Sequence, residues 1–134
     1  MKQLRSLLVL MLMFILCTGF IGKKNDKEKV VYAFGVAASF SDTLVYYTDI
    51  QLLDSVQLDK NKFLPKRQEY SRQLKEYVQY QLVHDNYTTM IYFSDKKEKL
   101  QKRFDKTLKK YQKDTIFSLH LIPTADFKFK KPQE

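Results

Sequence analysis

An apolar run from Leu7 to Ile21, preceded by Lys2 and Arg5, separates the N-terminus from the rest of the chain. A basic end followed by such a run is typical of a segment that directs export. The run has fifteen residues, fewer than the ~20 that a helix needs to cross a bilayer. We therefore expect residues 1–22 to be a signal peptide. The processed protein is then periplasmic or secreted and keeps no permanent membrane span.

The end of this segment allows two kinds of processing. Cys17 and Gly19 are small enough for the recognition positions of a signal peptidase, which then cuts before Phe20. A lipoprotein signal instead ends in a Cys that is acylated, and the residue before that Cys is normally Gly, Ala or Ser rather than Leu16. We expect simple cleavage, with lipid anchoring at Cys17 as the alternative.

The 112 residues after Gly22 contain no Cys and a single glycine, Gly35. Phosphate-binding loops need several glycines, and zinc ribbons and disulfide frameworks need cysteines. A segment of this length also holds only one hydrophobic core. We therefore expect one domain at 30–129, between a polar tether at 23–29 and a polar tail at 130–134, and we expect no cofactor.

Alternating side chains predict a hairpin at the start of the domain. Over residues 30–40 the odd positions are mostly small and the even positions mainly large, and a period of two is typical of a strand. Turn-forming residues follow, and residues 44–53 then alternate again, with the even positions on one face. Thr48 and Gln51 also resemble a helix capping box, so a short helix over 49–58 is the alternative.

A helix and a strand are predicted next. Pro65 suits the first position of a helix, and apolar residues at helical spacing behind it predict a helix over 66–83. Residues 87–93 are apolar or β-branched on both faces, which is typical of a central strand.

The C-terminal third predicts a second helix and a last strand. Asp95 can cap the helix, with Glu98 three residues on. Residues 115–122 predict a strand, and Phe127 and Phe129 a short edge piece after it. The apolar stripe of the second helix consists of Leu100, Phe104, Thr107, Leu108 and Tyr111.

The predicted order of strand, strand, helix, strand, helix, strand indicates an α+β fold. Each helix has one apolar stripe, so we expect a two-layer sandwich in which both helices cover one face of a mixed sheet of about four strands. The second helix then makes a right-handed parallel crossover. The other face is then polar, capped by a loop or used for a partner. For a partner, the side chains that would supply an apolar surface with polar tips are Tyr32, Phe34, Tyr46 and Tyr47.

The positive charge is concentrated in one segment. Residues 30–59 have four Asp and no Lys or Arg, whereas residues 96–113 have nine basic residues against two acidic ones, or +7 of the net +9. Such a segment is either a solvated helix face or a site for a polyanion. The candidate polyanion-binding residues lie off the apolar stripe: Lys102, Arg103, Lys106, Lys109 and Lys110.

The chain offers few residues for catalysis or metal binding. His84 lies beside Asp85, but no Ser or Cys nucleophile has a matching spacing, and its simplest role is to end a helix. His120 alternates with leucines as a strand-face residue. The aspartates of residues 49–59 recur at an odd interval, which puts them on alternate strand faces. We therefore assign no catalytic residue and no metal ligand.

Three phrases cover most of the domain: FGVAASFSDTLVYYTDIQLLDS, FLPKRQEYSRQLKEY and the ending TADFKF. Together with the export signal they resemble a group of small exported proteins from Bacteroidetes. This resemblance implies a location in a Gram-negative envelope and brings no activity with it.

The order of hairpin, arginine-bearing helix, strand and second helix resembles that of GIY-YIG endonucleases. In that family a Tyr-bearing hairpin, a helix Arg and a later helix Glu assemble around a metal. The matching positions are Tyr32 and Tyr46, Arg67 or Arg72, and Glu98. Neither signature triplet is present, so what the resemblance implies is a degenerate domain with a pocket formed by Tyr32, Tyr46, Arg67 and Glu98.

The sequence thus predicts an exported, non-enzymatic interaction module of the cell envelope, with an envelope protein or an acidic polymer as partner. The alternative is a degenerate GIY-YIG-like domain that binds nucleic acid or another polyanion through its basic second helix. An enzyme whose active-site residues have no recognisable pattern is a third hypothesis.

Overall fold

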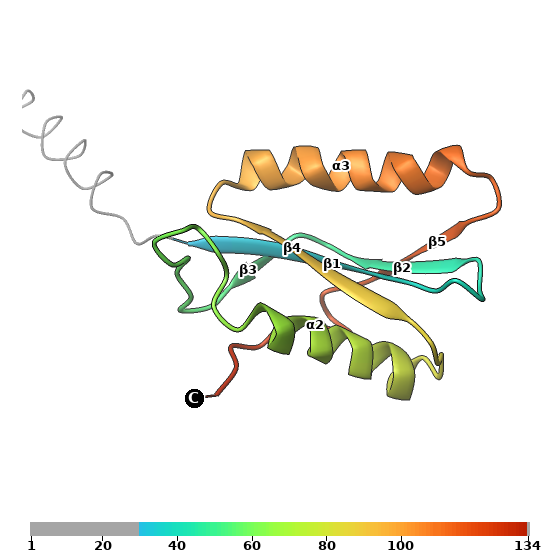
Figure 1. The fold of residues 1–134 in the computed structure, drawn as a ribbon, viewed down its shortest axis with the longest axis horizontal. Coiled ribbons are helices and arrows are strands. Elements are labelled where there is room, and N and C mark those ends of the chain that lie inside the picture. Colours follow the sequence, from blue (N-terminus) through green and yellow to red (C-terminus); the bar gives the residue numbers. More distant parts are fainter. Residues whose placement is uncertain (1–29, 134) are drawn as a thin grey trace, which may run out of the picture.

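The structure, a computed structural model, describes residues 30–133 as a sheet with a helix on each face (Figure 1). The α+β class, the mixed sheet and the predicted order of elements are confirmed. The predicted signal peptide at 1–22, with Cys17, and the predicted tether at 23–29 lie outside the described residues. The elements in chain order are β1 (Val31–Ala38), β2 (Leu44–Thr48), β3 (Gln51–Leu53), α2 (Arg67–Glu76), the π-helical turn η1 (Tyr77–Gln81), β4 (Thr88–Ser94), α3 (Lys97–Lys113) and β5 (Ser118–Ile122).

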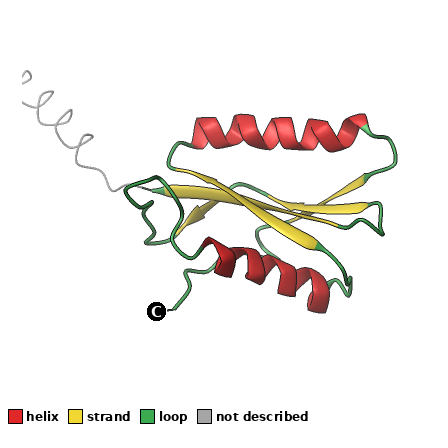
Figure 2. Ribbon diagram, in the orientation of Figure 1, coloured by secondary structure: helices red, strands yellow, loops and turns green. Residues whose placement is uncertain are grey.

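Strand β1 lies in the middle of the sheet. β4 pairs with one of its edges, β2 and β3 share the other edge, and β5 pairs with β2. β4 and β2 both run antiparallel to β1, and β5 is parallel to β2. The outer strands β4 and β5 are therefore parallel, and α3 connects them across one face (Figure 2). The prediction of a central strand at 87–93 is wrong, because in the described chain β4 pairs only with β1.

A bulge separates β2 from β3. Val36 is opposite Tyr47, and Ala33 is opposite Gln51. Two residues of β1 therefore lie opposite three residues between β2 and β3, and such an extra residue defines a bulge. The strand expected over 44–53 is present with this interruption, and the alternative helix over 49–58 is not formed.

The bulge has a buried hydroxyl at its centre. The Oγ1 atom of Thr48, whose residue is fully buried, accepts a hydrogen bond from the Gly35 N–H at 2.9 Å. The extra residue also reverses the alternation of side chains, so Tyr46 packs on the side of α2 and Ile50 on the side of α3. The expectation that all even positions of this strand share one face is therefore wrong.

The small residues of β1 face α2. A Cβ atom on Gly35 would lie 2.5 Å from Cδ2 of Leu74, which is itself fully buried. The helix approaches this closely because β1 has only a hydrogen at that position. The odd positions of β1 thus form the floor on which α2 packs.

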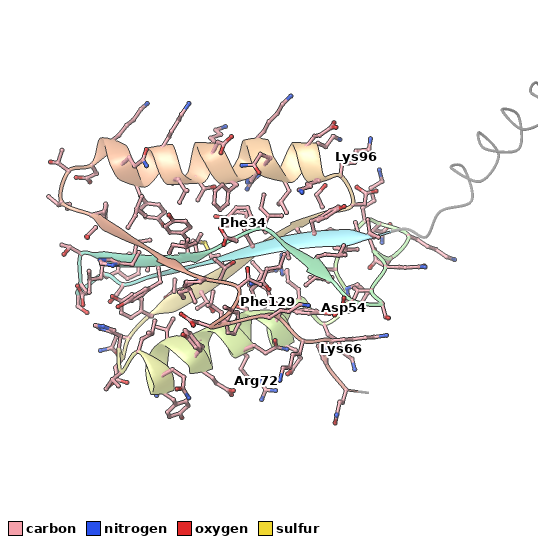
Figure 3. The ribbon with its side chains drawn as sticks, turned by 180° about the vertical axis from the view of Figure 1, so that it is seen from behind. Phe34, Asp54, Lys66, Arg72, Lys96 and Phe129 are labelled. Carbon is pink, nitrogen blue, oxygen red and sulfur yellow. The ribbon has the colours of Figure 1, made fainter. Side chains whose placement is uncertain are left out.

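The large residues of β1 face α3. Phe34 is fully buried and packs edge-to-face against Phe104, with ring centroids 5.1 Å apart. In Figure 3 Phe34 lies on the α3 side of the sheet and Phe129 on the α2 side. The expectation of both helices on one face is therefore wrong, because β1 is apolar on both faces and each face needs its own cover. The expected open surface of Tyr32, Phe34, Tyr46 and Tyr47 is likewise covered.

Phe127 and Phe129 do not form an edge strand. Both are buried on the α2 side, and the side chain of Gln51 holds the backbone between them. Its Nε2 donates to the Phe127 carbonyl and its Oε1 accepts from the Phe129 N–H, each at 2.9 Å. One buried amide thus supplies the two bonds that a strand partner would otherwise make.

Both helices begin later in the chain than predicted. Helix α2 begins after Lys66, whose φ of 56° is left-handed, so Pro65 is not its first residue. Helix α3 begins after Lys96, and the Lys96 N–H donates to Oγ of Ser94 at 3.0 Å, so Asp95 is not its cap.

Candidate functional site

Helix α3 presents its basic residues to solvent. The predicted stripe of Leu100, Phe104, Thr107, Leu108 and Tyr111 is buried or half-buried, as expected. Basic side chains therefore project away from the sheet (Figure 3). We call the five candidate polyanion-binding residues, all exposed, the cationic face: Lys102, Arg103, Lys106, Lys109 and Lys110.

All five residues of the cationic face line one open groove, together with Tyr92 and Met90 of β4. Lys113 adds a sixth cation to its lining, and Asp105 is the carboxylate among them. That carboxylate accepts a hydrogen bond at 3.0 Å from Nε2 of Gln101. The groove is strongly positive, which suits closely spaced anionic groups.

Arg103 is held in place by an aromatic stack. Its Cζ lies 5.1 Å from the centroid of the Tyr92 ring, and that ring stacks on Phe34 with a centroid separation of 4.8 Å. A cation is attracted to the face of a ring, and the guanidinium keeps its N–H donors for a ligand. Because Phe34 belongs to the core, the stack anchors Arg103 to a fixed part of the fold.

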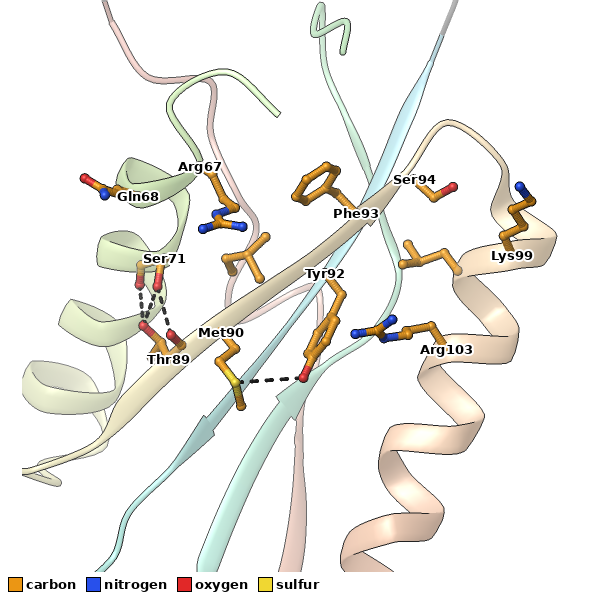
Figure 4. Close-up of a pocket in the computed structure, with 12 residues that line it drawn as sticks. Arg67, Gln68, Ser71, Thr89, Met90, Tyr92, Phe93, Ser94, Lys99 and Arg103 are labelled. Carbon is orange, nitrogen blue, oxygen red and sulfur yellow. Dashed lines mark hydrogen bonds between the residues drawn. The ribbon is translucent and has the colours of Figure 1, made fainter. Parts of the chain in front are cut away.

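A second groove of about 670 Å³ follows the outer edge of β4 (Figure 4). Arg67 of α2 lies on one side of it, and Lys99 and Arg103 of α3 lie on the other. No acidic residue lines it. We call this the β4 groove, and it meets the groove of the cationic face at Met90, Tyr92 and Arg103.

The structure does not bring Tyr32, Tyr46, Arg67 and Glu98 together. Tyr32 packs on the α3 side of the sheet and Tyr46 on the α2 side, so the sheet separates them. Arg67 lines the β4 groove, whereas Glu98 is exposed in the first turn of α3 and lines neither groove. The pocket that the endonuclease resemblance implies is not assembled by these four side chains.

Both histidines lie against Tyr46, with ring centroids at 5.5 Å for His84 and 5.8 Å for His120. Nδ1 of His84 is 3.9 Å from a carboxylate oxygen of Asp42, so its acidic neighbour in space is Asp42 rather than Asp85. Burial, and then the charge of Asp42, raise the pKa of Tyr46 above its ordinary value. Tyr46 is therefore neutral near pH 7 and cannot act as a base there.

Two hydrogen bonds lie near Tyr46 and the histidines. The hydroxyl of Tyr87 donates to the Leu44 carbonyl at 2.9 Å, and burial followed by the charge of Asp42 raises the pKa of Tyr87 to about 12. Oγ of Ser118 lies 3.1 Å from Nε2 of His120, but both residues are exposed. Within residues 30–133 no third group bonds to Nδ1 of His120, so nothing orients the imidazole for catalysis.

Acidic residues do not gather into a metal site in the described part of the chain. Between residues 30 and 133 no three His, Cys, Asp or Glu side chains are placed to hold a metal ion. Asp54 lies 3.6 Å from Nζ of Lys128, and Asp59 accepts bonds from the N–H groups of Asn61 and Phe63. These aspartates therefore serve local structure.

Sequence reasoning did not single out Lys99 or Tyr92. Lys99 precedes Arg103 by four residues, and this spacing puts the two on one side of a helix. Tyr92 alternates with its neighbours in β4, which puts it on the face that α3 covers. The helical spacing of Lys99 was visible in the sequence. The role of Tyr92 became clear only once the position of α3 was known.

Comparisons with known proteins give no match from which a function of this surface could be inferred. The chain matches no protein family, no curated protein and no solved structure. Neither α2 nor α3, the helices described, has both the length and the apolar character to cross a membrane.

Proposed function

We propose that this chain is a small exported, non-enzymatic interaction module that binds an acidic partner through the cationic face of α3. The observation that carries the proposal is that Lys102, Arg103, Lys106, Lys109 and Lys110 line one groove. Export is supported by the basic and apolar N-terminal segment, which lies outside the described residues.

The arrangement favours the cationic face over the aromatic surface that the sequence also indicated. Within residues 30–133 the hairpin tyrosines are half-buried and pack into the apolar clusters on the two faces of the sheet. The basic side chains of α3, in contrast, are exposed, and Arg103 is already oriented by Tyr92. An oriented side chain loses less conformational entropy when it binds.

The partner chemistry is a run of closely spaced phosphates, sulfates or carboxylates. Residues three or four apart on a helix present their side chains about 5–6 Å apart. Lysine and arginine at that spacing can each meet a separate anionic group and release its counterions. A nucleic acid, an acidic glycan and an acidic polypeptide all offer such groups.

Two variants of equal net charge test this proposal. One changes the five residues of the cationic face to Gln. The control also changes five exposed lysines to Gln, but away from α3: Lys60, Lys75, Lys128, Lys130 and Lys131.

Heparin is the probe, titrated at low salt by calorimetry, and circular dichroism verifies that both variants fold. We expect the control to keep most of the wild-type affinity. The α3 variant should lose about 100-fold or more, because its phosphate- or sulfate-binding cations are gone. Equal losses in the two variants would show that only total charge matters and would refute the assignment.

A further inference from the structure

Among residues 30–133, no strand pairs with the outer edge of β4, so this edge carries free backbone groups. Gly35 directs its N–H to Thr48, away from β4, so its partner Ile91 occupies a non-hydrogen-bonded position of the β1–β4 pair. In an antiparallel pair such residues point their own N–H and C=O groups to the opposite edge. The direction of the backbone N–H and C=O groups alternates along a strand, so those of Phe93 point the same way as those of Ile91. Both residues therefore present their backbone groups to the β4 groove.

One end of this edge is already occupied by a side chain. Oγ of Ser71 lies 3.2 Å from the Thr89 carbonyl oxygen and 2.7 Å from its hydroxyl, and the Thr89 hydroxyl donates to the Ser71 carbonyl at 2.9 Å. Helix α2 therefore closes the edge at Thr89, as the dashed lines in Figure 4 show. The open length runs from Met90 to Ser94 and lies along the β4 groove.

Cations flank this open edge on both sides. The guanidinium of Arg67 lies toward β4 from α2, and the Lys99 ammonium and the Arg103 guanidinium flank the edge from α3 (Figure 4). Side chains of an added strand alternate between the two faces of a sheet. Carboxylates on either set of alternate residues would therefore meet a cation.

We propose that the β4 groove binds an acidic polypeptide segment in an extended conformation, which adds to the sheet as a strand beside β4. Backbone bonds to Ile91 and Phe93 supply affinity and register, and Arg67, Lys99 and Arg103 select carboxylates. This inference rests on the proposed function, because it names the class of acidic partner and shares Arg103 with the cationic face.

Charge argues against a second copy of this chain as the added strand. Two β4 edges in antiparallel contact would bring the three cations of one groove against the same three of the other. Neither groove contributes a carboxylate to offset this repulsion. An unpaired edge strand flanked by positive charge therefore resists self-association and accepts an acidic segment.

Amide hydrogen exchange followed by NMR tests the strand addition. The probe is an eight-residue peptide of alternating Glu and Thr with blocked ends, and heparin is the comparison ligand. We expect the peptide to slow exchange of the Ile91 and Phe93 amides at least about tenfold, because both become hydrogen-bonded. Heparin should leave these two amides unchanged. Peptide binding without this protection would overturn the strand addition.

Two matched variants test the role of charge in the β4 groove. Arg67→Gln removes a cation that lines the β4 groove and lies outside the cationic face, and Arg72→Gln removes one from the same helix outside the groove. Arg67→Gln should weaken peptide binding about fivefold or more and leave heparin binding unchanged, and Arg72→Gln should alter neither.

The outcomes separate the two proposals. Equal peptide affinities for both variants would overturn the β4 groove as the peptide site, while heparin binding would still report on the cationic face. If heparin bound the α3 variant and the control variant equally well while the peptide still protected Ile91 and Phe93, the proposed function alone would be overturned. A dimer that forms without peptide and protects the same amides would assign the edge to a second copy and overturn the inference.

Discussion

Substituting Gly35 by Ala tests how closely α2 packs on the sheet. The added Cβ would lie 2.5 Å from Cδ2 of Leu74, 3.1 Å from Cζ of Phe129 and 3.2 Å from Cδ1 of Ile91. Carbon atoms in good contact are about 3.5–4.0 Å apart. All three neighbours are buried, so relief requires movement of the core.

The expected cost follows from this crowding. Forcing one methyl group into a packed core typically destabilises a protein by about 1–3 kcal/mol. Removing the obstructing side chain by Leu74→Ala costs about 2–5 kcal/mol, because Leu74 is fully buried and leaves a cavity. In the double variant the new methyl group occupies part of that cavity. The double variant should therefore be destabilised by less than the sum of the two single variants, and the difference should be at least about 0.5 kcal/mol.

Urea unfolding of the wild type, both single variants and the double variant measures these free energies in one cycle. For a domain of about 100 residues, each 1 kcal/mol also lowers the melting temperature by about 4–8 °C. A neutral Gly35→Ala variant, or strictly additive costs, would show that Leu74 does not pack against Gly35.

Three further predictions follow from single features of the chain. Thr48→Val should destabilise by about 1–3 kcal/mol in urea unfolding, because the Gly35 N–H loses its acceptor, whereas Thr48→Ser should cost only about 1 kcal/mol. The pKa of Tyr87 is raised to about 12, so the neutral hydroxyl stabilises the fold fully below pH 10 and this stabilisation disappears as pH rises through 12. Tyr87→Phe should therefore lose less stability between these pH values than the wild type does, and an equal loss would contradict the assignment. Intact-mass analysis of envelope fractions should find a chain without roughly its first twenty residues, whereas an unprocessed cytoplasmic chain would contradict export.

Local patterns predicted the elements well because each one depends on its own periodicity. The stripe of α3 and the alternation of β1 are visible in the sequence. The stripe is buried or half-buried as expected, whereas the large face of β1, expected to be open, is covered by α3. The bulge after Thr48 was not predictable, since one extra residue changes the register without changing composition. The placement of the helices on opposite faces was not predicted, although both the large even and the small odd residues of β1 are apolar and each set needs a cover.

The site was predictable only where it depends on one helix. The five residues of the cationic face follow from helical spacing alone, and all are exposed. The β4 groove combines Arg67 of α2 with Arg103 of α3, which are far apart in the chain. Their proximity depends on the sheet between the helices, and no local pattern contains that information.

The salt dependence of duplex DNA binding tests the central claim most directly, since a duplex is a rod of known charge density. If the five cations of the cationic face each displace one counterion, the slope of log K against log salt is about −4 to −5. The variant with these five residues changed to Gln should give a slope near zero, and the control variant should keep the wild-type slope. A wild-type slope near zero, or the same steep slope in the α3 variant, would contradict the cationic face of α3 as the binding surface.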